Sequence, residues 1–144
     1  ISKELALYVV IYAPVQMAAD LPKHYEGNPA FQFILDVPTD WEHTITLNGE
    51  IGEYITVARK DIESDDWYLG SITNEDSRNI NIDLSFLDGN RRYNAMIYKD
   101  PANGGWQSNP EEVVIIEQVF NSNDTYEIVL PSGGGQAIRL SPIN

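Results

Sequence analysis

The chain has 144 residues, 42% of them hydrophobic, which is enough for one domain with its own core, with or without an attached fragment. Asp and Glu outnumber Lys and Arg by 22 to 9. The resulting net charge of −13 disfavours nucleic acid and anionic lipid as partners, because both are bound through Lys and Arg. The lack of cysteine excludes disulfides, thiol catalysis and thiolate zinc sites.

The opening segment is unusually apolar for a chain of this size. Residues 5–13 read LALYVVIYA, and VQMAA follows after Pro14. We expect a helix with Ser2 as its N-cap that runs to about Ala13, and a second short helical piece over residues 15–19 that ends at Pro22. A helix that is apolar all round needs neighbours on every side, so we expect protein upstream of this chain to cover it.

Two membrane interpretations of this segment are weaker. A spanning helix needs about 20 apolar residues, whereas this run is shorter and contains Pro14 and Gln16, so we expect no membrane span. A secretory signal would fit Lys3 followed by an apolar stretch. Glu4 and Met17 stand where such a signal does not favour them, so a buried helix is the preferred interpretation.

The boundary between two parts of the chain falls near Pro38. Asn28 and Pro29 form a cap followed by proline at the first helical position, which predicts a short helix through residues 31–35. Pro38 breaks the pattern, and strand-like alternation follows. We therefore divide the chain into a helical segment, residues 1–38, and a β domain, residues 39–144.

The β domain contains about eight predicted strands joined by short polar turns. Residues 80–86 show the clearest alternation, with four apolar side chains on one face. Short antiparallel strands at this spacing predict a β-sandwich of Greek-key type. The predicted strands are residues 44–49, 54–60, 67–73, 79–84, 93–98, 113–120, 126–130 and 136–140.

No residue pattern indicates a catalytic centre. His24 and His43 are the only histidines, and structural roles are the better interpretation for both. Ser132 precedes glycines 133–135, but the spacing is not that of a nucleophile elbow, and no helix follows that could bind phosphate. The glycines are better explained by a tight connection that needs positive φ, or by close backbone packing.

Acidic residues give no site either. The run over residues 61–66 lacks the glycine and glutamate spacing of an EF-hand and is interpreted as a turn, so no metal ligand is assigned. Glu50 with Glu53, or Glu111 with Glu112, could be imagined as a glycosidase pair. Nothing in the sequence places either pair in a cleft, so no catalytic residue is named.

Trp106 is the one candidate contact for a carbohydrate. It lies in a polar, glycine-rich loop and is expected to be the most exposed of the three tryptophans. An indole ring can stack on the apolar face of a sugar, although packing over a sheet edge is the plainer alternative. Trp41 and Trp67 are interpreted as core or boundary residues.

Several short sequence stretches along the chain resemble the C-terminal region of glycoside hydrolase family 97. Each stretch is a weak match alone, but together they occur in the same order as in the family and extend across nearly the whole sequence. The loop over residues 101–110 departs from the family pattern, so any role of that loop in relatives is not carried over. The matching stretches are residues 5–17, 19–25, 37–41, 49–54, 57–59, 66–70, 82–87 and 133–135.

The resemblance implies a parent enzyme with more domains than this chain holds. Family members are calcium-dependent α-glucosidases and α-galactosidases of Bacteroides-type bacteria, typically periplasmic or secreted, with a (β/α)8 barrel followed by a β-sandwich. Residues 1–38 would be the end of the barrel, and residues 39–144 the sandwich. The catalytic carboxylates and calcium ligands would lie upstream, so this chain would be a non-catalytic accessory domain whose partners are the barrel and a homo-oligomer.

Two other function classes stay open at this point. The sandwich could be a carbohydrate-binding module that uses loop aromatics such as Trp106 to hold an oligosaccharide. Alternatively, the chain could be a free-standing interaction protein whose apolar helix docks onto a partner. The parent's sugar, its stereochemical outcome and its activity are not encoded in these residues.

Overall fold

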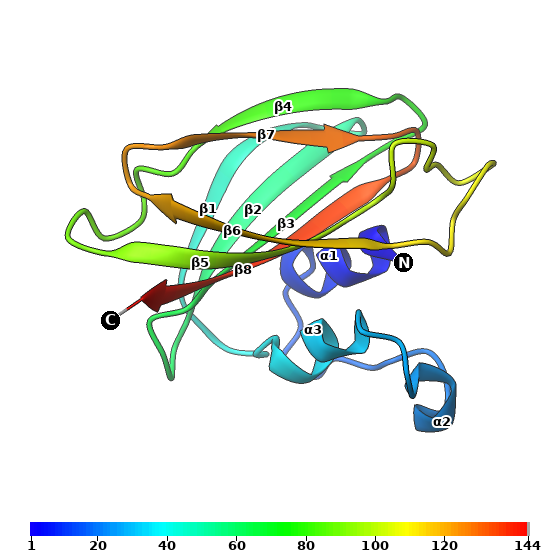
Figure 1. The fold of residues 1–144 in the computed structure, drawn as a ribbon, viewed down its shortest axis with the longest axis horizontal. Coiled ribbons are helices and arrows are strands. Elements are labelled where there is room, and N and C mark those ends of the chain that lie inside the picture. Colours follow the sequence, from blue (N-terminus) through cyan, green and yellow to red (C-terminus); the bar gives the residue numbers. More distant parts are fainter. Residues whose placement is uncertain (144) are drawn as a thin grey trace.

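The computed structural model describes residues 1–143 as three short helices followed by a two-layer β-sandwich (Figure 1). Each predicted strand is present, with ends that shift by a few residues, so the predicted mainly-β fold is confirmed. The helices are α1 (Ser2–Val10), α2 (Pro22–Tyr25) and α3 (Phe31–Asp36). The strands are β1 (Trp41–Glu50), β2 (Tyr54–Asp61), β3 (Trp67–Thr73), β4 (Arg78–Asp83), β5 (Arg92–Lys99), β6 (Val114–Asn121), β7 (Thr125–Leu130) and β8 (Gly135–Ile143).

The strands form two antiparallel sheets. Six strands pair in the order β1-β2-β3-β8-β5-β6, and β4 pairs with β7 in a second, two-stranded sheet. From β5 the chain passes through β6, crosses to β7 and returns as β8 beside β5, which is a Greek-key connection. In Figure 1 the β4–β7 ribbon lies above the large sheet, and the helices lie on its other side.

The core between the sheets follows the alternation seen in the sequence. Ile80 and Ile82 on β4 are buried, while the alternating residues Asn79, Asn81 and Asp83 are exposed. They meet the inner face of the large sheet, where Trp67 is among the buried residues. Burying one face of each strand in this way fixes the register, because a slip of one residue would turn the apolar set outward.

The helical segment differs from the prediction in several places. Ala30, not Asn28, is the N-cap of α3, so Pro29 lies outside the helix. Ile1, not Ser2, is the N-cap of α1, and Ser2 is buried inside the first turn. α1 ends at Val10, four residues before Pro14, whose ring would clash with that carbonyl if the helix continued. The predicted helix over residues 15–19 is absent, because Gln16 instead folds back and donates to the carbonyl oxygens of Tyr8 and Ile11.

Pro22 starts a helix instead of ending one. The first N–H groups of a helix have no hydrogen-bond partner within the helix, so the missing N–H group of proline costs nothing there. The fixed φ of proline also suits a helix, and α2 therefore begins at Pro22. In the described part of the chain, no helix has the length and apolar character that a membrane span requires.

Candidate functional site

The helices form a layer on the outer face of the large sheet, and the inner side of this layer is a second apolar core. Leu5, Ala6 and Val9 of α1 and Phe33 of α3 are each at most 2% exposed. The Phe33 ring contacts the rings of Tyr68 and Tyr98 edge to face, at centroid distances of 5.9 and 5.2 Å. The helical segment is therefore packed into the sandwich on this side.

Two glycines let α1 lie directly on the sheet. A Cβ atom at Gly70 on β3 would lie 2.5 Å from the carbonyl oxygen of Ala6 and 3.0 Å from the Cβ atom of Val9. A Cβ atom at Gly135 on β8 would lie 2.5 Å from the Cα atom of Lys3. Both distances are below van der Waals contact, so only glycine permits this approach of helix and strands.

Arg59 on β2 donates hydrogen bonds to the free carbonyl groups at the C-terminal end of α1. Its Nε donates to the carbonyl oxygen of Val9 at 2.6 Å, and Nη1 donates to Thr44 Oγ1 at 2.9 Å. Its guanidinium also lies over the ring of Trp41, and among residues 1–143 no carboxylate forms an ion pair with it. Burial lowers the pKa of Arg59, and the partial negative charge of the helix C-terminus compensates the buried cation.

A second arginine holds α3 to the sheet. Arg139 on β8 donates to Asp36 Oδ2 at 2.6 Å and to Asp66 Oδ2 at 2.8 Å. Tyr68 donates its hydroxyl to the carbonyl oxygen of Asp36 at 2.9 Å. Burial acts to lower the pKa of Arg139, but the hydrogen bond to Asp66 and the nearby charges outweigh it, so the net pKa is raised. Asp36, at the end of α3, is thereby fixed from two strands.

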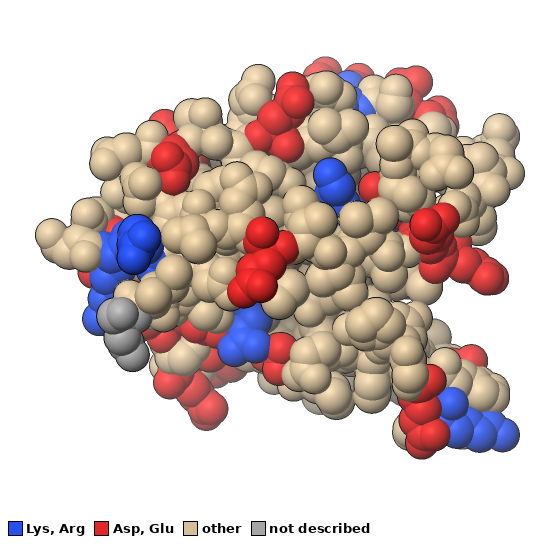
Figure 2. All heavy atoms as spheres, viewed as in Figure 1, with Lys and Arg blue, Asp and Glu red and all other residues tan. Residues whose placement is uncertain are grey.

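The helical segment also leaves several large apolar side chains exposed, most of them in the loop between α1 and α2. We define the helical face as the five exposed side chains Tyr12, Val15, Met17, Leu21 and Leu35, which are 57–84% exposed. A cavity of about 560 Å³ lies beside them, between α1 and α3, with Tyr8, Tyr25 and Phe31 in its lining. Figure 2 shows charged side chains gathered at the α2 end of this layer, while the surface over α3 is mainly uncharged.

Trp106 lies over the turn between β7 and β8. It is 58% exposed, whereas Trp67 is buried and Trp41 is intermediate, as predicted. A Cβ atom at position 133 would lie 2.8 Å from Trp106 Cδ1, and Gly133 has a φ of +67°, so glycine is required there on both grounds.

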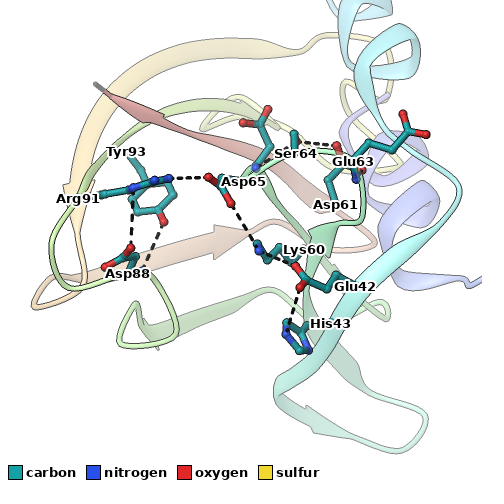
Figure 3. A network of polar contacts seen from close by, with 11 residues as sticks. Glu42, His43, Lys60, Asp61, Glu63, Ser64, Asp65, Asp88, Arg91 and Tyr93 are labelled. Carbon is teal, nitrogen blue, oxygen red and sulfur yellow. Dashed lines mark hydrogen bonds and ion pairs between the residues drawn. The ribbon is translucent and has the colours of Figure 1, made fainter.

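The acidic run over residues 61–66 forms the predicted turn between β2 and β3. Ser64 Oγ donates to Asp61 Oδ2 at 2.6 Å, which closes the turn. Asp65 pairs with Arg91 at 2.7 Å and with Lys60 at 3.6 Å, in a surface network that joins this turn to the turn that precedes β5 (Figure 3). The hydrogen bond from Arg91 lowers the pKa of Asp65. These groups neutralise one another at the surface, and such exposed pairs contribute little to stability.

The other candidate residues are not brought together. His43 lies at the surface on β1, 4.0 Å from a Glu42 oxygen, and His24 pairs with Asp20 near α2. Within residues 1–143, no three His, Asp or Glu side chains converge in a way that could hold a metal ion.

Sequence reasoning missed the roles of Arg59 and Arg139. The sequence did contain an indication for Arg59. In the alternating pattern of β2, Arg59 falls on the same face of the strand as the apolar residues Ile55 and Val57. A charged residue at the end of an apolar row indicates a buried polar partner. That partner, the end of α1, lies 50 residues away in sequence and could not be named from the strand alone.

The architecture defines an accessory sandwich domain with exposed apolar side chains on its helical segment. The family model described as "Glycosyl-hydrolase 97 C-terminal, oligomerisation" matches residues 40–141. The chain belongs to this family.

Individual relatives found by sequence and by structure belong to the same family of enzymes. A retaining alpha-galactosidase of Bacteroides thetaiotaomicron is 43% identical over an alignment 142 residues long, which covers 96% of this chain and 20% of that protein. Structures of a Glycoside Hydrolase Family 97 enzyme from Pseudoalteromonas sp. strain K8, one of them in complex with acarbose, are 47% identical and superpose with a TM-score of 0.95. They cover 99% of this chain, helical segment included, and 22% of that enzyme. The chain thus spans about a fifth of the length of these relatives.

Proposed function

We propose that this chain is the non-catalytic C-terminal domain of a longer family 97 glycosidase and that its helical face docks on the catalytic domain. Residues 1–38 then complete the barrel, and residues 39–144 form the sandwich that supports it. The observation that carries the proposal is the helical layer itself, which is buried on its sheet side and apolar on its outer side. A surface of this kind normally marks a contact with other protein.

The relatives support the rest of the proposal. Both named relatives are glycoside hydrolases about five times longer than the matched region, so the parent is expected to cleave α-galactosidic or α-glucosidic bonds. Calcium is expected in the upstream domains, as the resemblance to the calcium-dependent family implies. The resemblance also favours a periplasmic or secreted location, and the family description favours a role in oligomerisation.

The non-catalytic role predicts that the isolated chain hydrolyses no glycoside. Purified chain, supplied with calcium and with p-nitrophenyl α-glucoside or α-galactoside, should release nitrophenol at the buffer rate, since the chain corresponds to only about a fifth of the glycosidases that it matches. The longer enzyme, assayed in parallel, is the positive control. Turnover by the isolated chain that survives repurification would contradict the accessory role.

A second candidate function is a sugar contact at Trp106. The ring borders a cavity of about 470 Å³ that is also lined by Lys3, Glu4, Glu75 and Asp100. One side of the indole rests on Gly133, and within the described residues its Nε1–H donates to no protein acceptor. An open aromatic face with hydrogen-bonding groups around it fits a neutral sugar ring.

This contact predicts that oligosaccharides change the fluorescence of Trp106. Titration with maltooligosaccharides or α-galactosides should give a saturable change at millimolar concentration, because a single stacked ring supports only weak binding. The change should vanish in Trp106→Ala and persist in Trp41→Phe, which alters a tryptophan remote from the cavity. Spectra that stay constant up to 50 mM sugar, a limit on the order of the weakest useful affinity, would remove this candidate.

A further inference from the structure

A polar cavity lies between α3 and the strands β5 and β8 of the large sheet (Figure 1). Its volume is about 370 Å³, at the lower end of the range for small-molecule sites. Asn94, Met96 and Tyr98, which alternate along β5, line it together. Arg139 of the neighbouring strand β8 and Gln32 of α3 also contribute to the lining. None of its residues belongs to the cavity of the proposed sugar contact, so this is a separate place on the molecule.

The hydroxyl group of Tyr98 borders this cavity without a partner. Tyr98 is only 4% exposed, and its ring packs on Phe33 in the core beneath α3. Within residues 1–143 its hydroxyl makes no hydrogen bond, whereas the hydroxyl of Tyr68, in the same core, donates to the carbonyl oxygen of Asp36. Burial, with a smaller contribution from the Asp36 carboxylate, raises the pKa of Tyr98, so the hydroxyl keeps its proton and can donate. Phenylalanine would fill the same space without an unpaired polar group, so the fold alone does not account for this hydroxyl.

Other groups around the cavity keep spare hydrogen-bonding capacity. Gln32 Nε2 donates to Asp36 Oδ1 at 2.8 Å, and Asn94 Nδ2 donates to a Glu117 oxygen at 2.7 Å. The carbonyl oxygens of these two amides accept no hydrogen bond from a described residue and remain as acceptors. Arg139 uses Nε and Nη1 for its ion pairs, which leaves Nη2 as a donor in the described part of the chain. Donors and acceptors for a ligand are thus both present.

The charges around the cavity favour a neutral ligand. Arg139 is shared between the carboxylates of Asp36 and Asp66, at 2.6 and 2.8 Å, so an anion would meet more negative than positive charge. An ammonium group only donates hydrogen bonds and would leave the donors of Tyr98 and Arg139 unpaired. A neutral molecule with several hydroxyl groups can pair with donors and acceptors alike, and Met96 offers an apolar contact for its C–H groups.

We infer that this cavity binds one neutral sugar unit, with the Tyr98 hydroxyl donating a hydrogen bond to it. The mixture of donors and acceptors selects a polyhydroxylated ligand, and the small volume limits it to about one ring. The inference depends neither on the contact at Trp106 nor on docking of the helical face, because none of those side chains lines this cavity.

NMR titration of the isotope-labelled chain with methyl α-D-galactoside tests the inference. The side-chain amide signals of Gln32 and Asn94 should shift saturably, with a dissociation constant on the order of 10 mM, because a few hydrogen bonds to a small ligand give weak binding in water. Tyr98→Phe should weaken binding about tenfold, since one hydrogen bond to the sugar is lost. The same substitution should not lower the urea midpoint of unfolding, because no described residue loses a partner.

Tyr93→Phe is the matched control. Tyr93 lies on the same strand and is 2% exposed, but it packs in the core between the sheets. Its substitution should change the affinity for the sugar less than about twofold. Trp106→Ala should likewise leave the shifts of the two amides unaltered, which separates this cavity from the contact at Trp106.

Two further sugars test the chemistry of the ligand. Methyl α-D-galacturonoside carries a carboxylate in place of a hydroxymethyl group and should bind about tenfold more weakly, because Asp36 and Asp66 oppose a negative charge. Raffinose presents the same α-galactosyl unit at the end of an oligosaccharide and should bind within about threefold of the methyl galactoside, since the cavity holds one ring.

Four results would overturn the inference. They are amide shifts that do not saturate up to about 100 mM sugar, equal affinity in Tyr98→Phe and wild type, a loss in Tyr93→Phe as large as in Tyr98→Phe, and equal binding of the galacturonoside. None of them changes what is expected of the helical face or of Trp106, which have their own tests.

Discussion

Phe33→Ala is expected to lower the free energy of unfolding by about 3–5 kcal/mol, because it empties the centre of the core between the helices and the sheet. Phe33 is 0% exposed and its ring contacts Tyr68 and Tyr98. Urea denaturation followed by circular dichroism measures the change. If the helical segment were a loose appendage, the same substitution would cost almost nothing.

Leu35→Ala is the matched control for this prediction. It removes a large aliphatic side chain from the same helix, but Leu35 is 63% exposed and points away from the sheet core. Its effect on the free energy of unfolding should stay within about 0.5 kcal/mol. A loss for Leu35→Ala as large as that for Phe33→Ala would mean that the structure has assigned the buried side of α3 wrongly.

Arg59→Met is expected to cost about 2–3 kcal/mol of stability. Methionine keeps much of the aliphatic volume of arginine but leaves the carbonyl oxygens of Val9 and Val10 without the donors that Arg59 provides. The amide of Ile11, which donates to Leu7 in the last turn of α1, should also exchange with deuterium faster. Both changes follow from losing a positive charge at the C-terminus of a helix.

The control for Arg59 is Arg92→Met. Arg92 lies exposed at the start of β5, so the same chemical change should leave stability and the exchange of Ile11 nearly unaltered. Unfolding at the same urea concentration in Arg59→Met and in wild type would show that the end of α1 does not depend on this arginine.

The sandwich could be predicted because its signals are local. Alternation at Ile80 and Ile82, and short polar turns such as residues 61–66, specify strands without knowledge of distant residues. The end of α1 could not be predicted in the same way. It depends on Arg59, which is far along the chain, and on Gln16, which folds back onto the helix instead of extending it.

The sequence predicted that the helical segment would need protein neighbours, but not which of its residues would be buried. The apolar run at the start of the chain predicted a segment that needs neighbours, and the structure divides its residues between two sides. Leu5 and Val9 pack on the sheet, whereas Val15 and Met17 remain exposed. Close approach at Gly70 could not be inferred from sequence, because a glycine in a strand has several explanations and only the packed helix selects one.

The rate of Met17 oxidation by hydrogen peroxide tests the docking account most directly. Met17 is 84% exposed in this chain, and Met96 on β5 is partly buried and provides an internal reference. Peptide mass spectrometry should show that Met17 oxidises about tenfold more slowly in the longer enzyme than in the isolated chain, because a docked domain excludes peroxide, while Met96 keeps its rate. Equal rates for Met17 in the two proteins would contradict the account.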